Sequence, residues 1–507
     1  MRPLVLVLLA LLAFACERPR EQPKKREPLI MRSVLLSMGR ADFGPFSPRA
    51  TEHQLAPQGG ERVHAKARFV WIRRRPTPES EWDGYITLGQ SLRIRSDVPS
   101  EQGTGTVCER WIPVEPSGWV CIGRDATLVA EDPVAVALRE DAADTSSPWP
   151  FDYARSLETP RYRKVPTMQE QRATEGDVPT LVKKIDKARD AKSKEELKAI
   201  DARLVEATLD LATERAPELF APPYTILESD ERLKFGSTIA FTRTFLHDDR
   251  SWLLSWDRAV IPMARTKVYP RSAFHGTVLE EGITLPLAFS KKHPAKRYRL
   301  DHNGVGTDVL RDIPPHTLIQ LGREASRGEY VHTADDWWVK RSEVAVIEPT
   351  AKLPKRLPAS GRRTWVEVST VGGWLVAFEG EKPVYATLIS AGKGEVLPDG
   401  SMRATSSTPI GTYSVASKFR TATMRSDRRP DMVHAEVMYT QVFFGDYALH
   451  GAYWHDEWGD RRSAGCVNLA PIDSKWLFDW SEPRMPEDWH AKRVLGGDPS
   501  TVVVGHP

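Results

Sequence analysis

A cysteine and a histidine near the end of the sequence have the residue types that thiol catalysis requires. Cys466 follows Gly465, and His450 lies upstream, directly before Gly451. A free thiol titrates at about 8.5, and a neighbouring imidazolium can hold it as the nucleophilic thiolate at neutral pH. A glycine before the nucleophile lets the backbone turn tightly and present amide N–H groups to an oxyanion. Spacing alone does not show that His450 and Cys466 meet, so a buried structural thiol is the alternative.

The segment that precedes this pair has the pattern of a β-meander. Apolar and polar residues alternate over 365–370, and β-type segments follow over 374–379 and 384–390. Glycine-containing turns at 371–373 and 380–383 separate them. Alternation with this punctuation predicts antiparallel strands joined by tight turns.

Three short motifs complete the pattern, namely Thr408-Pro-Ile-Gly-Thr-Tyr413, His450-Gly451 and Ser463-Ala-Gly-Cys-Val-Asn468. With the meander, they resemble the L,D-transpeptidase catalytic domain, the YkuD family, over residues 363–507. The resemblance implies that Cys466 is the nucleophile and that His450 is its general base or imidazolium partner. It also implies an oxyanion hole at the Gly465 and Cys466 amides, supported by Ser463 and Asn468. The residues expected along the substrate groove are Tyr439, Gly451, Tyr453 and Trp454, and core packing is the alternative for the aromatic ones.

The sequence departs from the family at one position. The family's usual phrase is Ser-His-Gly-Cys, and Ala464 stands where it has the histidine. This puts substrate orientation or oxyanion polarisation in doubt, and nearby His455 is a candidate to compensate. A metal site is a weak alternative, because no glutamate-bearing zinc signature is present. Its ligands would be His434, His450, His455 and Asp456.

The N-terminal residues indicate export, and export determines how the other cysteines are interpreted. A charged start is followed by a short apolar run that ends before Cys16, as in a secretory signal peptide. The run has about 12 residues, which is too few to span a bilayer core of about 30 Å. The phrase Ala13-Phe-Ala-Cys16 resembles a bacterial lipobox, which implies acylation of Cys16, with an ordinary signal peptide as the alternative. In an oxidising compartment Cys108 and Cys121 would form a disulfide, and two free thiols are the alternative.

Composition and patterning divide the chain into segments. A net charge of +3 does not favour a nucleic-acid-binding protein, and a 40% hydrophobic share supports folded cores. Residues 61–131 resemble a bacterial SH3-like barrel, and 261–350 resemble a diverged second copy. The remaining segments are a signal peptide (1–16), a flexible tether (17–60), a partly helical region (132–260) with one or two surface helices over 180–216, a hinge (351–362) and the catalytic domain (363–507). We therefore expect a mainly β protein with a β-sandwich-like catalytic domain.

The expected function is peptidoglycan L,D-transpeptidation in the cell envelope or periplasm, without a metal or organic cofactor. Peptidoglycan stem peptides would be donor and acceptor, and an N-terminal lipid would attach the protein to a membrane. Water as acceptor would make the protein an L,D-carboxypeptidase, and a protein amine would make it an enzyme that anchors proteins to the wall. A non-catalytic wall-binding scaffold is a further alternative.

Overall fold

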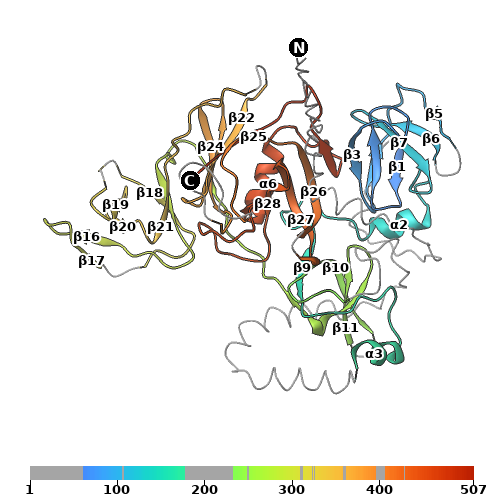
Figure 1. The fold of residues 1–507 in the computed structure, drawn as a ribbon, viewed down its shortest axis with the longest axis horizontal. Helices are drawn as coiled ribbons and strands as arrows, with labels where there is room; N and C mark the ends of the chain where they lie inside the picture. The colour runs from blue at the N-terminus through green and yellow to red at the C-terminus, as the bar shows by residue number, and fades with distance from the viewer. Residues whose placement is uncertain are drawn as a thin grey trace, which may run out of the picture.

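The computed structural model describes residues 61–507 apart from 105–107, 177–231, 248–249, 309–311, 323, 325, 358–360, 395–405 and 427–428. The expected signal peptide, the lipidation site at Cys16, the tether and the helices over 180–216 lie outside the described residues. The described chain is mainly β, as the sequence predicts (Figure 1). None of its helices has both the length and the apolar character needed to cross a bilayer.

The C-terminal region contains the longest strands and one helix that packs against them. Its meander is β22 to β24, and β26, β27 and β28 form the next antiparallel run. The elements are β22 (Thr364–Ser369), β23 (Trp374–Glu379), β24 (Lys382–Ser390), β25 (Gly411–Ser414), β26 (Ser417–Ser426), β27 (Arg429–Phe444), β28 (Tyr447–Gly451), β29 (Val467–Leu469), α6 (Pro471–Trp480), β30 (Ala491–Arg493) and β31 (Val502–His506).

A buried lysine fixes the end of α6. Lys418 is fully buried, and its Nζ donates to the carbonyl oxygens of Phe478 at 2.6 Å and Ser481 at 3.0 Å. These carbonyls end the helix and lack intrahelical partners, so the lysine supplies the donors that they need. Burial lowers the pKa of Lys418 to about 7. These hydrogen bonds hold the helix against β27 and β28, the strands behind the candidate site.

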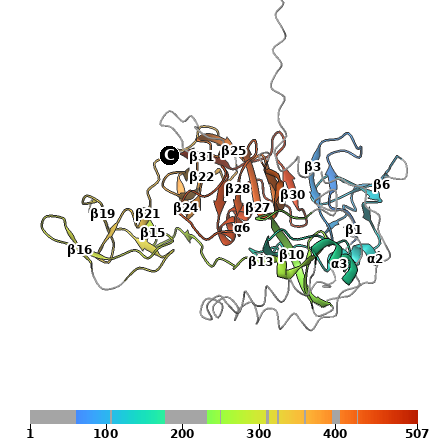
Figure 2. The ribbon, with the colours of Figure 1, turned by 60° about the horizontal axis from the view of Figure 1, so that its bottom comes forward.

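The N-terminal unit is all β and is continuous with the C-terminal sheet. Its strands are β1 (Arg62–Ala65), β2 (Val70–Arg73), β3 (Trp82–Ile86), β4 (Ser91–Arg93), β5 (Glu101–Gln102), β6 (Cys108–Pro113), β7 (Trp119–Gly123) and β8 (Ala126–Thr127). Strand β3 pairs with β30, through Gly84 with Lys492 and Tyr85 with Ala491 (Figure 2). One sheet therefore runs in the order β25-β31-β22-β23-β24-β29-β28-β27-β26-β30-β3-β2-β7-β6-β5.

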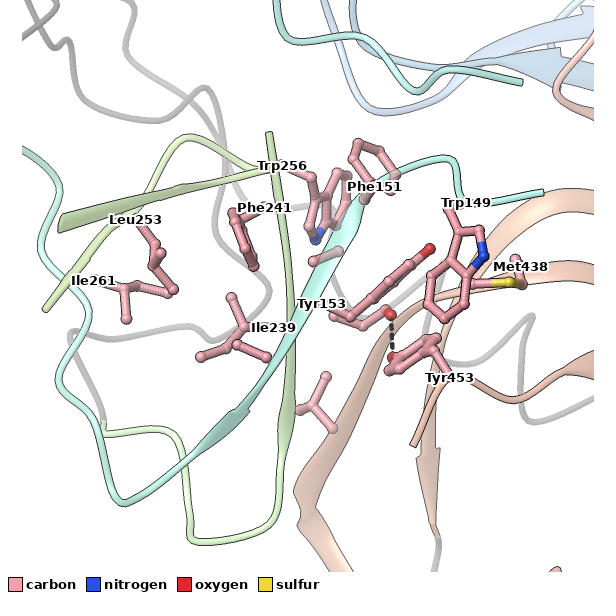
Figure 3. Close-up of a cluster of buried hydrophobic side chains, with 14 of the residues drawn as sticks. Trp149, Phe151, Tyr153, Ile239, Phe241, Leu253, Trp256, Ile261, Met438 and Tyr453 are labelled. Atoms are coloured by element: carbon pink, nitrogen blue, oxygen red, sulfur yellow. Dashed lines mark hydrogen bonds between the residues drawn. The ribbon is translucent and has the colours of Figure 1, made fainter. Parts of the chain in front are cut away.

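The central unit covers one side of β27. It contains α2 (Pro133–Arg139), β9 (Asp152–Ser156), α3 (Met168–Glu175), β10 (Thr238–His247), β11 (Arg250–Ser255), β12 (Val260–Pro262), a 3-10 turn (Met263–Arg265) and β13 (Thr266–Val268). Tyr153 of β9 stacks on Tyr453 with ring centroids 3.7 Å apart (Figure 3). The Tyr153 hydroxyl donates to the Glu436 carbonyl at 2.9 Å. The described part of 132–260 combines the helices α2 and α3 with the strands β9, β10 and β11.

A further β unit precedes the meander. It contains β14 (Thr277–Val278), β15 (Leu287–Ser290), β16 (Tyr298–Leu300), β17 (Gly306–Asp308), β18 (Leu318–Gln320), β19 (Tyr330–His332), β20 (Trp338–Lys340) and β21 (Val344–Ile347). Strand β14 pairs with β24, through Thr277 with Ala386. Phe274, Phe289 and Trp458 share one core, so this unit packs directly on the loop that follows β28.

We expect Gly84→Val to weaken the junction between the N-terminal unit and the catalytic sheet. A Cβ at Gly84 would lie 2.3 Å from the Ala491 carbonyl oxygen and 2.4 Å from Trp489 Cε3. Overpacking of this kind lowers the free energy of unfolding by about 1–3 kcal/mol. Calorimetry should show a lower melting temperature and an early transition of the N-terminal unit. Gly496→Ala is the control, because a Cβ there meets nothing within 4 Å. A Gly84→Val protein that melts like its parent would contradict the described pairing.

Candidate active site

Two neighbouring parallel strands position the candidate catalytic residues. Strands β28 and β29 pair with Leu449 opposite Val467 and His450 opposite Asn468. Cys466 directly precedes β29 and packs against the same apolar cluster as Ala448. Because side chains alternate along strands, Cys466, His450 and Asn468 lie on one face of the sheet. We call this face the catalytic face.

His450 is held in the tautomer that a general base requires. Its side chain is 3% exposed, and its Nδ1 lies 3.0 Å from the Gly451 carbonyl oxygen. A carbonyl only accepts hydrogen bonds, so the network assigns the proton to Nδ1 and leaves Nε2 with its lone pair. Burial lowers the pKa of His450 to about 4, so the imidazole is neutral at pH 7.

The thiol of Cys466 is also neutral at rest. Its side chain is partly buried, and its Sγ lies 3.8 Å from the Asp446 carbonyl oxygen. Burial raises the pKa of Cys466 to about 11, although a hydrogen bond from the Ala448 amide favours the thiolate. In the described chain no direct hydrogen bond joins Sγ to the imidazole of His450. Of the two roles expected for His450, general base or imidazolium partner, the apolar surroundings favour the general base, because they disfavour both charges.

The turn before Cys466 is fixed by side-chain hydrogen bonds. Ser463 Oγ accepts from the Gly465 amide at 3.0 Å and donates to the Cys466 carbonyl. Thr408 Oγ1 donates to the Gly465 carbonyl at 2.9 Å. Gly465 has φ +134°, and a Cβ there would lie 2.6 Å from Tyr447 Cε1, so the turn requires glycine. Of the two amides expected at the oxyanion hole, the one of Gly465 is engaged by Ser463.

The residues expected along the groove divide into two groups. Tyr439 is fully buried and Tyr453 is 3% exposed, and both belong to the core between the central unit and β27. Their expected place in the groove is corrected to core packing, because the central unit covers them. Gly451 is also a packing residue, since a Cβ would lie 2.4 Å from Met438 Cγ. Trp454 is only partly buried, and its ring lies 5.8 Å from that of His450.

His455 lies beside the catalytic strands, and its Nε2 is 3.1 Å from the side-chain amide of Asn468. Burial lowers the pKa of His455 to about 4. Among the described residues, no group of three or more His, Cys, Asp or Glu side chains is placed to hold a metal ion. The four ligands considered from the sequence therefore form no such group.

Two cysteines of the N-terminal unit are joined, and that unit also approaches the nucleophile. Cys108 of β6 and Cys121 of β7 form a disulfide with a Cα–Cα distance of 5.5 Å.

The cluster against which Cys466 packs includes Tyr85 of β3 and Phe419 of β26. Sequence reasoning missed this contact, because no local pattern signals that β3 pairs with β30.

Comparison with known proteins identifies the C-terminal region. The model of the L,D-transpeptidase catalytic domain, YkuD, matches residues 363–503. A similar solved structure is an L,D-transpeptidase from Xylanimonas cellulosilytica, with 23% identity over 30% of this chain and 65% of that chain and a TM-score of 0.21. A cysteine-to-serine mutant of the Enterococcus faecium L,D-transpeptidase has 21% identity over 28% of this chain and 49% of that chain, with a TM-score of 0.21. An L,D-transpeptidase from Mycobacterium smegmatis has 14% identity over 42% of this chain and 78% of that chain, with a TM-score of 0.22. The chain spans only 65% and 49% of the length of the first two. No curated protein matches it.

We expect the alkylation rate of Cys466 to rise with pH without a plateau near neutrality. The reactive species is the thiolate, and with a pKa of about 11 its population grows tenfold for each pH unit below that value. Iodoacetamide labelling between about pH 6 and about pH 10, quantified by mass spectrometry of the peptide containing residue 466, measures this rate. A rate that is already constant from about pH 5 to about pH 8 would reveal an imidazolium–thiolate pair and contradict the description.

Proposed function

We propose that this protein is a peptidoglycan L,D-transpeptidase that forms 3→3 cross-links through a thioester on Cys466. The observation that supports the proposal best is the placement of Cys466 and the base-competent His450 on one face of β28 and β29. Both residues lie inside the region that matches the L,D-transpeptidase catalytic domain. The match supports an enzyme of this kind, and the cross-linking chemistry is our inference.

In the first half-reaction, Sγ attacks the carbonyl carbon of the third stem residue, usually meso-diaminopimelate. As the S–C bond forms, the thiol proton passes to His450 Nε2. The C–N bond to the terminal D-Ala then breaks, and His450 gives the proton to the leaving amine. Because both groups are neutral at rest, deprotonation of the thiol accompanies the attack.

In the second half-reaction, the side-chain amine of another stem peptide attacks the thioester. His450 takes a proton from this amine, the C–S bond breaks, and the proton returns to the sulfur. The enzyme is thereby restored with a neutral thiol and imidazole. Water or a protein amine as acceptor would follow the same steps, giving hydrolysis or protein anchoring.

The proposal includes the location and the role of the flanking units. We infer that the protein works in the cell envelope as an exported lipoprotein acylated at Cys16. The sequence segments 61–131 and 261–350, which resemble SH3-like modules, would hold wall peptides near the site and raise their effective concentration.

We expect purified protein incubated with disaccharide tetrapeptide to form a dimer that is lighter than two monomers by one D-Ala. Cys466→Ala should abolish this product, and His450→Gln should slow it by about 10²–10⁴-fold through loss of the base. Mass spectrometry of the products measures both effects.

Two other outcomes have defined meanings. A Cys466-dependent tripeptide without dimer would replace transpeptidation by carboxypeptidation. The absence of any Cys466-dependent product, together with no covalent carbapenem adduct, would contradict an enzyme and favour a wall-binding scaffold.

A further inference from the structure

The loop between β28 and Cys466 supplies an imidazole to a site that has Ala464 in place of the family histidine. His455 lies in this loop, and the Glu457 amide donates to its Nδ1 at 3.3 Å. A backbone N–H only donates, so Nδ1 must be unprotonated. Burial keeps the ring neutral at pH 7, with a pKa of about 4. The proton of His455 is therefore on Nε2.

This tautomer determines how the Asn468 amide is oriented. The amide atom nearest to His455 Nε2 is 3.1 Å away. Two N–H groups cannot hydrogen-bond to each other, so the network assigns the amide oxygen to this position. The NH₂ group then takes the position of Oδ1, to which no group of the described chain donates, so this orientation loses no hydrogen bond there.

This NH₂ group belongs to a residue of the catalytic face. Asn468 is 2% exposed and is paired in register with His450. An NH₂ group held on this face can donate a hydrogen bond to a ligand that supplies an acceptor. A carbonyl oxygen of a bound peptide is such an acceptor.

The loop that carries His455 is held by the β unit that precedes the meander. Ser272 Oγ donates to Asp456 Oδ1 at 2.6 Å, and Lys292 forms an ion pair with Glu457. Phe274 of the same unit packs against Trp458. Contacts on both sides of Glu457 therefore fix the amide that sets the His455 tautomer.

We propose that His455 is a positioning residue that holds the Asn468 amide with its NH₂ group toward the catalytic face, where it donates to a carbonyl oxygen of the donor stem peptide. The inference rests on the proposed function, because it takes a stem peptide as the ligand. It assigns to His455 an orienting role and no part in proton transfer to the substrate.

Peptide binding to an inactive enzyme tests this role separately from turnover. In the Cys466→Ala background, calorimetry measures the Kd for the tetrapeptide L-Ala-γ-D-Glu-meso-diaminopimelyl-D-Ala. We expect His455→Leu to weaken binding about tenfold through loss of the Asn468 donor. His455→Gln is the matched control, because its amide NH₂ reaches the position of Nε2, and we expect binding within about threefold of the parent.

A second measurement separates orientation from general damage. With Cys466 present, His455→Leu should raise KM while the iodoacetamide labelling rate of Cys466 stays unchanged. Equal Kd values for His455→Leu and the parent would overturn the inference. Equal weakening by His455→Leu and His455→Gln would overturn it as well.

The outcomes for the two proposals are distinguishable. If binding depends on His455 as expected but no Cys466-dependent product forms, the proposed function fails and the positioning role stands. If product forms while His455→Leu binds like the parent, the positioning role fails and the proposed function stands. If the parent does not bind the tetrapeptide, the inference is overturned, and product analysis alone decides the function.

Discussion

The parallel pairing of β28 with β29 is the constraint on which the candidate site depends. The register that sets His450 opposite Asn468 also brings Cys466 to the same face. A shift by one residue would turn one set of side chains to the opposite face and separate the thiol from the imidazole. The tight turn at Gly465 and its bonds to Ser463 and Thr408 set where β29 begins, so they hold this register.

Burial gives this site its electrostatic character. Apolar neighbours surround the thiol, and part of them comes from β3 of the N-terminal unit. The same desolvation that keeps His450 unprotonated also keeps Cys466 as a thiol, with a pKa raised to about 11. The thiol proton of Cys466 must therefore pass to His450 while the sulfur attacks the substrate carbonyl. The flanking units thus influence the chemistry even though they supply neither catalytic residue.

Sequence reasoning predicted local features well and tertiary features poorly. The meander over 364–390 follows from alternation and glycine turns, and the described strands β22 to β24 coincide with it. The sequence left both groove lining and core packing open for Tyr439 and Tyr453, because the segment that covers them is distant in sequence and has no motif for docking. It also left both roles of His450 open, because the burial of the thiol depends on strands from another unit. The orientation of Asn468 depends on a hydrogen bond to the Glu457 amide, and no residue pattern encodes that bond.

The central claim is that the thiol of Cys466 becomes acylated by the donor stem peptide. Intact-protein mass spectrometry at short times after mixing with tetrapeptide, followed by peptide mapping, tests it most directly. The account predicts an adduct with the mass of the donor stem lacking its terminal D-Ala, on the peptide that contains residue 466, and no adduct in Cys466→Ala. An adduct on another residue, or cross-linked product formed by Cys466→Ala, would contradict it.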